Sequence, residues 1–206
     1  GYYNLKEIDY SRKNIRHFPG LNGITAIIEK DSTHMWIGTS TGLYLLEKAT
    51  GKYTYIQMPV ESYYIYSLCQ ASDGMLYIGT NNAGLLVYDT TKNTFRHYHR
   101  DNCALISNNI YTLLSDGKGN IFLSTEHGLS TFYPVEETFH NWTKEQGLKS
   151  DHFNAASGTL RKNGNFIFGS TDGAIEFNKD MILPRDYKFK MVFSDLRAVS
   201  YTHLRA

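Results

Sequence analysis

Short apolar segments separated by polar turns run along the whole chain, and one of these segments returns four times. The copies are MWIGT at 35–39, LYIGT at 76–80, IFLST at 121–125 and FIFGS at 166–170. Measured at Gly38, Gly79, Ser124 and Gly169, the steps between the copies are 41, 45 and 45 residues. A polar turn precedes each copy, and a glycine with a further apolar segment follows it. The chain is therefore built from a repeated unit of about 40–45 residues.

Each unit can be divided into four short strands. In the second unit we expect them at 65–70, 75–80, 84–88 and 94–98, with a hairpin turn at Asp73-Gly74. The second strand is almost wholly apolar, as in a strand covered on both faces, whereas the fourth alternates polar and aromatic residues, as at an outer edge. A plain β-sandwich is the alternative, but it gives no reason for one pentapeptide to return four times. The sequence predicts an all-β fold over residues 1–182: an incomplete β-propeller, an open arc of about four four-stranded antiparallel blades.

The balance of charged residues bears on which partners the chain could bind. The chain has 21 basic and 20 acidic residues, a net charge of +1, so the basic face of a nucleic-acid-binding protein is not expected. No apolar run reaches ~18 residues, so we expect no membrane span within it. Cys69 lies in an apolar strand and Cys103 in a polar loop, and we expect two free thiols.

The usual catalytic and metal-binding patterns are absent from the sequence. His97 and His99 would share one face of a strand, but no third ligand stands at a fixed spacing, so we interpret them as part of a solvated outer strand. Glu136 and Glu137 fall in a turn between strands. We therefore expect a non-catalytic segment that holds neither a cofactor nor a metal.

Binding is the function that remains. In a propeller, the loops between the second and third strands and the loops between blades gather at one end, around the axis. Here these loops combine aromatic rings with amide and imidazole groups, which suits carbohydrates because sugars carry apolar faces beside hydroxyl groups. Each position taken singly is also an ordinary turn residue. The candidate ligand-binding residues are Tyr63, Tyr64, Asn81, Asn82, Asn108, Asn109, His127 and His152.

The segment Trp36-Ile37-Gly38-Thr39-x-x-Gly42-Leu43 resembles the two-component regulator propeller repeat. The resemblance covers most of residues 1–178, and the third copy departs from the pattern at Phe122 and Ser124. It implies a sensor region of a hybrid two-component regulator of the Bacteroidetes type. Such a region is the periplasmic ectodomain of an inner-membrane protein; it recognises an oligosaccharide for polysaccharide utilisation and works as a homodimer in the full-length receptor.

Two other functions stay open. Streptogramin lyases use related propeller repeats, but a lyase needs a His/Glu cluster that converges at the axis, and the sequence offers only the isolated His127 and His152. A propeller can also be a scaffold for protein–protein interaction.

Both ends of the chain suggest a piece of a larger protein. We expect residues 1–18 to form the third and fourth strands of a preceding blade. Residues 183–198 resemble the first strand of an immunoglobulin-like domain, which in this family leads to a transmembrane helix and a histidine kinase. Membrane attachment is expected only through such downstream segments. Residues 199–206 resemble translated adapter sequence, and we interpret them as a non-native tail.

Overall fold

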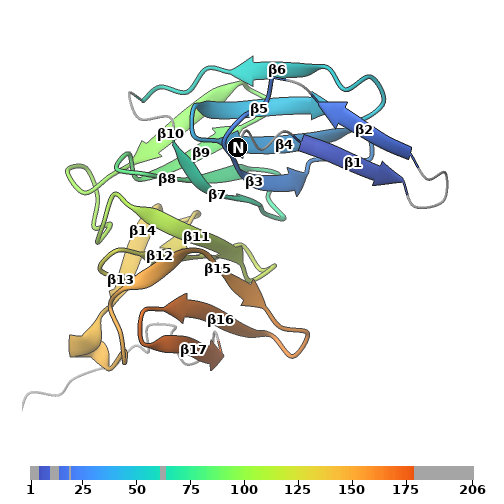
Figure 1. Cartoon of the computed structure of the whole chain (residues 1–206). Coiled ribbons are helices and arrows are strands. Elements are labelled where there is room, and N and C mark those ends of the chain that lie inside the picture. Colours follow the sequence, from blue (N-terminus) through green and yellow to red (C-terminus); the bar gives the residue numbers. More distant parts are fainter. Residues whose placement is uncertain (1–4, 10–13, 19, 61–63, 179–206) are drawn as a thin grey trace, which may run out of the picture.

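Antiparallel strands make up almost all of the described chain. The computed structural model describes residues 5–9, 14–18, 20–60 and 64–178, which form five sheets (Figure 1). Strands β1 (Leu5–Asp9) and β2 (Asn14–Phe18) pair as a hairpin. In this part of the chain, the one helical element is a 3-10 turn at Lys144–Gln146.

Four further sheets follow, which we number as blades one to four. Blade one holds β3 (Ile24–Glu29), β4 (His34–Thr39), β5 (Gly42–Glu47) and β6 (Tyr53–Ile56). Blade two holds β7 (Ile65–Gln70), β8 (Leu76–Thr80), β9 (Leu85–Asp89) and β10 (Thr94–Tyr98). Blade three holds β11 (Ile110–Ser115), β12 (Ile121–Thr125), β13 (Gly128–Tyr133) and β14 (Thr138–Trp142). Blade four holds β15 (Phe153–Leu160), β16 (Asn165–Ser170) and β17 (Gly173–Asn178).

Every blade is a meander in which consecutive strands pair. The first strands lie side by side: β7 packs between β3 and β11, and β11 packs between β7 and β15. The first strand of each blade is therefore the inner one, the fourth is the outer one, and the blades succeed one another in an arc (Figure 1).

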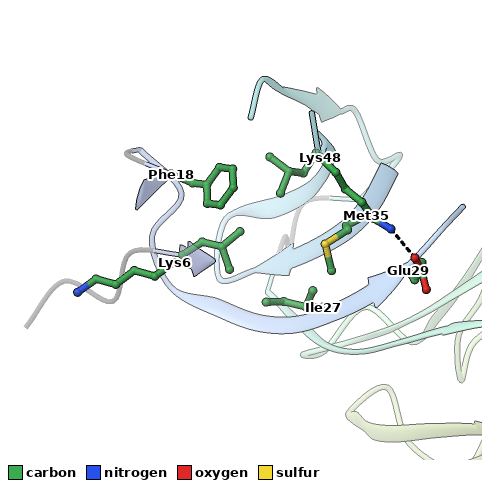
Figure 2. Close-up of a pocket in the computed structure, with 8 residues that line it drawn as sticks. Lys6, Phe18, Ile27, Glu29, Met35 and Lys48 are labelled. Atoms are coloured by element: carbon green, nitrogen blue, oxygen red, sulfur yellow. Dashed lines mark hydrogen bonds and ion pairs between the residues drawn. The ribbon is translucent and has the colours of Figure 1, made fainter. Parts of the chain in front are cut away.

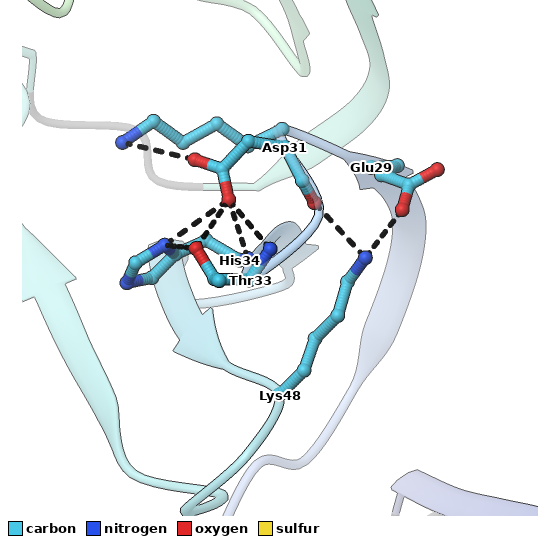
Figure 3. Close-up of polar contacts among 6 residues, drawn as sticks. Glu29, Asp31, Thr33, His34 and Lys48 are labelled. Atoms are coloured by element: carbon cyan, nitrogen blue, oxygen red, sulfur yellow. Dashed lines mark hydrogen bonds and ion pairs between the residues drawn. The ribbon is translucent and has the colours of Figure 1, made fainter.

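In blades one to three, an aspartate side chain accepts backbone N–H groups in the hairpin between the first and second strands. In blade one, Asp31 Oδ1 accepts the backbone N–H groups of Thr33 and His34, both at 2.8 Å, and the Thr33 hydroxyl at 2.6 Å (Figure 3). The bonds from Thr33, first of all that of its hydroxyl, hold the pKa of Asp31 well below its ordinary value. Lys48 Nζ closes the turn by donating to the Asp31 carbonyl at 2.9 Å and by pairing with the Glu29 carboxylate. These polar groups shape the turn and belong to the fold.

The core lies between the blades. Blades one and two enclose a cluster that includes Trp36, Ile65 and Leu76, and blades three and four enclose one that is mainly phenylalanine. The repeated glycine permits this contact: a Cβ on Gly38 would lie 2.8 Å from Ile65 Cγ2 of the next blade. Glycine therefore recurs at this position because the second strand approaches the inner strand of the next blade closely.

One repeat position shows how blade packing decides burial. Ile27, Leu68 and Leu113 pair with equivalent residues of their second strands. Ile27 in blade one is 41% exposed, whereas Leu68 and Leu113 are 6% and 3% exposed. The latter two are buried because an inner strand of the preceding blade lies beside them.

A cleft of about 520 Å³ opens beside Ile27 (Figure 2). Leu5 and Phe18 of the β1–β2 hairpin line one side, and Ile27 and Met35 of blade one line the other. A two-stranded sheet covers less of its neighbour than a four-stranded blade does, so the cleft follows from blade packing.

These observations confirm the predicted all-β propeller arc. Three blades are complete, blade four has three described strands, and β1 and β2 form the hairpin expected near the start of the chain. Both cysteines are free thiols. The expected immunoglobulin-like strand at 183–198, the tail at 199–206 and the domain boundary at 182 lie outside the described residues. Within the described ranges, no helix is both long and apolar enough to cross a membrane.

Candidate functional site

The turns between second and third strands meet the connections between blades at one end of the arc, which we call the loop end. In three blades, the first residue of the turn between the second and third strands donates its backbone N–H to a carbonyl oxygen. That carbonyl belongs to the residue just before the inner strand. These bonds are Ser40 N to Gly23 O at 2.9 Å, Asn81 N to Tyr64 O at 2.9 Å and Thr171 N to His152 O at 3.0 Å. In blade three the equivalent residues are joined through side chains, because Asn109 Nδ2 donates to Glu126 Oε2 at 2.7 Å. The repeat thus brings the same two positions together in every blade while their side chains vary.

A bulge occurs near the start of the inner strand in the first three blades. The extra residue in the ladder is Thr25, Tyr66 and Tyr111, respectively. A bulge redirects the side chain of its extra residue. The rings of Tyr66 and Tyr111 lie 5.2 Å apart between centroids, edge to face, and the Tyr64 ring lies 5.0 Å from Tyr66. Tyr64, Tyr66 and Tyr111, which we call the tyrosine cluster, form one aromatic surface across blades two and three.

Glu126, in the β12–β13 turn, links this surface to the polar groups of the loop end. Its carboxylate accepts from Asn109 Nδ2, and Asn109 Oδ1 in turn accepts the backbone N–H of Asn82 at 2.8 Å. His127 Nε2 lies 4.0 Å from Glu126 Oε2, and His152 Nδ1 lies 3.2 Å from the Glu126 carbonyl oxygen. Asn109 and His127 thus lie at the Glu126 carboxylate, His152 lies at its backbone carbonyl, and Asn109 connects it to Asn82 of blade two.

The tyrosine cluster is close enough to Glu126 to be affected by its charge. Burial is the main reason that the pKa of Tyr66 is raised, and the charges of Tyr64 and Glu126 add to it. Burial also raises the pKa of Tyr111, again with added effects from Glu126 and Tyr66. Both hydroxyl groups are thus neutral at physiological pH and can donate or accept hydrogen bonds.

A hollow of about 220 Å³ lies among the inner strands of all four blades. Its lining includes Thr25, Tyr66, Thr112 and Ala156. Two of these residues, Thr25 and Tyr66, are the bulge residues of blades one and two, so the hollow is continuous with the loop end.

The structure brings together five of the residues predicted from the sequence. Tyr64, Asn82, Asn109, His127 and His152 all lie around Glu126 and Tyr66. The two histidines are therefore not isolated, contrary to the sequence interpretation, because the repeat places both beside Glu126. They do not form a metal site, since no group of three His, Cys, Asp or Glu side chains within the described ranges could hold an ion.

The other predicted residues are placed differently. Asn108 supports its own loop, since its Oδ1 accepts from Arg100 N and its carbonyl accepts from Gly84 N. Asn81 lies half-buried beside Tyr64. Tyr63 lies outside the described residues.

Sequence reasoning missed Tyr66, Tyr111 and Glu126. Tyr66 and Tyr111 lie within the inner strands β7 and β11, so a choice made among loop residues passed over them. The available signal was alignment of the repeats, which puts Thr25, Tyr66 and Tyr111 at one position.

The rings of His97, in the outer strand β10, and of His99, just after this strand, lie close together, with centroids 4.7 Å apart. His97 is not simply solvated, however, because its Nε2 lies 2.6 Å from the Ala83 carbonyl oxygen in the β8–β9 turn. The side chain therefore helps to hold that turn.

Comparisons with known proteins agree with this fold. Residues 59–82 match the family model described as two component regulator propeller. Histidine kinase P4 of Formosa agariphila is 22% identical over 85% of this chain, and the match covers 13% of that protein.

Two solved structures from B. thetaiotaomicron are similar. The extracellular domain of a proposed one-component system superposes with a TM-score of 0.69 at 19% identity, over 86% of this chain and 24% of that one. The extracellular domain of a proposed hybrid two-component system superposes with a TM-score of 0.55 at 19% identity, over 84% of this chain and 31% of that one. This chain thus spans less than a third of the length of each of these relatives. The chain is a β-propeller segment in which residues 59–82 match the two component regulator propeller repeat.

Proposed function

We propose that this segment belongs to the periplasmic sensor region of a histidine-kinase receptor and that its loop end binds an oligosaccharide. The sensor role is supported by the matched repeat, by the kinase relative and by the two extracellular domains that share the fold. In such a receptor this segment binds its ligand without turnover, phosphoryl transfer belongs to a separate kinase module, and the ectodomain acts as a homodimer.

The tyrosine cluster carries the proposal for the ligand. Sugar rings present apolar C–H faces that stack on aromatic side chains, and their hydroxyl groups need nearby donors and acceptors. Tyr66 and Tyr111 supply ring surface at equivalent positions of adjacent blades, and Glu126 and Asn109 stand beside them. A surface that spans two blades suits an extended ligand of several sugar units.

Calorimetry with the full chain tests this function. The probes are cello-, xylo-, laminari-, arabino- and galacturono-oligosaccharides. We expect at least one to bind, and Tyr66→Ala to weaken it about tenfold to a hundredfold, because loss of a central aromatic contact costs roughly 1–3 kcal/mol. Tyr64→Ala and Asn109→Ala should weaken the same probe.

The matched control is Tyr53→Ala, which removes an aromatic side chain from the outer strand β6, where Tyr53 packs against Tyr44. This variant should bind as the parent does. Absence of binding to every probe, or equal loss in Tyr53→Ala and Tyr66→Ala, would contradict the proposal.

A further inference from the structure

One position of the loop end carries a charge in blade three alone among the four blades. The first residue of the turn between second and third strands is Ser40, Asn81, Glu126 and Thr171 in blades one to four. Three of these side chains are neutral, and Glu126 is a carboxylate. The difference calls for an explanation because, in all four turns, the preceding threonine or serine hydroxyl donates to the carbonyl of the glycine that follows.

The turn does not need the carboxylate for its own structure. Thr125 Oγ1 donates to the Gly128 carbonyl at 2.9 Å and accepts the His127 N–H at 3.1 Å. Thr39 makes the equivalent pair of bonds in blade one, with Gly42 and Thr41, where the charged residue is absent. The turn is thus fixed by the preceding threonine in both blades.

Glu126 also differs in its partners from three other glutamates that pair with a lysine or an arginine. Glu29, Glu137 and Glu176 form ion pairs with Lys48, Arg96 and Arg161. Among the described residues, the only ion-pair partner of Glu126 is His127 at 4.0 Å, and the one hydrogen bond to its carboxylate comes from the neutral Asn109 amide. A carboxylate can accept about four hydrogen bonds, so Glu126 keeps acceptor capacity toward a ligand.

The location of this charge decides which ligands can approach. Glu126 acts on the hydroxyl groups of both Tyr66 and Tyr111, so its field covers the aromatic surface on which a sugar would stack. Two like charges 4 Å apart repel by ~1 kcal/mol in water and by ~4 kcal/mol at the effective dielectric constant of a protein surface. Sugar hydroxyl groups and ammonium groups instead donate to a carboxylate.

We propose that Glu126 is the charge-selecting residue of the loop end, so that the site accepts neutral or amino-bearing oligosaccharides and rejects uronate and sulfate groups beside the tyrosine cluster. This inference rests on the proposed function and narrows its ligand class. Asn109 is a positioning residue, because its amide donates to the Glu126 carboxylate and is itself held by the backbone N–H of Asn82.

The experiment uses the full chain, whichever of the cello- and laminari-oligosaccharides binds more tightly, and the same probe after oxidation of its primary hydroxyl groups to carboxylates. We expect the oxidised form to bind the parent protein at least about tenfold more weakly, as the repulsion given above implies. Glu126→Gln keeps an acceptor for Asn109 but removes the charge. It should bring the affinities for the oxidised and the neutral probe to within about threefold of each other. Added salt should narrow the difference in the parent only.

The matched control is Glu136→Gln, which removes an exposed carboxylate from the turn between β13 and β14, between a third and a fourth strand and therefore away from the loop end. It should leave both affinities unchanged. Equal binding of both probes by the parent, or tightest binding of galacturono-oligosaccharides, would overturn charge selection and leave oligosaccharide binding intact. Binding of no probe at all would contradict both.

Discussion

The repeat glycine of blade two provides a direct test of how the blades pack. Gly79 lies in β8, and a Cβ at this position would come within 2.8 Å of Ile110 Cγ2 and 2.9 Å of the Ile110 carbonyl oxygen. The side chain could shift, but the carbonyl belongs to β11, which is paired with β12 at Thr125. Gly79→Ala must therefore push blades two and three apart or distort the inner strand.

Two opposing effects set the magnitude. Replacing a strand glycine by alanine stabilises by about 0.4–1 kcal/mol through the unfolded state when the native conformation allows it, and Gly79 has no positive φ. Insertion of a methyl group into a packed interface without free space costs about 1–3 kcal/mol. We expect a net loss of about 1–2 kcal/mol, because a backbone atom blocks the new methyl group.

Ser124 is the matched control, because it occupies the same repeat position in blade three and already carries a Cβ. Its hydroxyl is fully buried and has no hydrogen-bond partner within the described residues. Ser124→Ala should therefore be neutral or stabilising by up to about 1 kcal/mol. Urea unfolding followed by the fluorescence of Trp36 and Trp142 measures both variants. A Gly79→Ala midpoint equal to or above that of the parent would refute the packing argument.

Two further predictions concern stability. Ser67 Oγ accepts the buried N–H of Leu113 from the next blade at 3.0 Å, so Ser67→Ala should cost about 1–3 kcal/mol in urea unfolding, and a loss below the error of the measurement would count against this bond. Hydrogen bonds, chiefly from the Thr91 hydroxyl, lower the pKa of Asp89 from 3.8 to about 2. A lowered pKa means that this carboxylate stabilises the fold fully above pH ~4 and loses that effect as the pH falls toward ~2. The melting temperature of Asp89→Ala should accordingly lie below that of the parent at neutral pH and approach it near pH 2, whereas a constant difference would argue against the linkage.

The fold could be predicted well because each level of the sequence agrees with it. The recurring apolar segment forms the second strand of each blade, and the turn before it joins that strand to the first. The glycine at position 38 or 79 lets the second strand pack against the inner strand of the next blade. In blade two, the inner strand β7 and the outer strand β10 have the predicted bounds. The bounds of β8 and β9 differ from the predicted ones by at most one residue.

The candidate site was only partly predictable. Position in the loops was enough to find Tyr64, Asn109 and His152, because the topology of the repeat fixes which loops meet. It was not enough for Tyr66, because this residue lies within the inner strand β7 and its ring meets those of Tyr64 and Tyr111 only in the folded chain. Glu126 was missed for a different reason: its importance comes from neighbours on three blades, and these come together only in the folded chain.

Hydrogen–deuterium exchange tests the central claim, that the loop end is the ligand-binding end of this propeller segment. Exchange would be followed by mass spectrometry with and without the oligosaccharide that binds most tightly. We expect slower exchange in residues 64–66, 108–111 and 126–127, where the tyrosine cluster and Glu126 lie, and unchanged exchange in the turns at 72–75 and 117–120. Protection confined to those turns, or to the cleft beside Ile27, would contradict it.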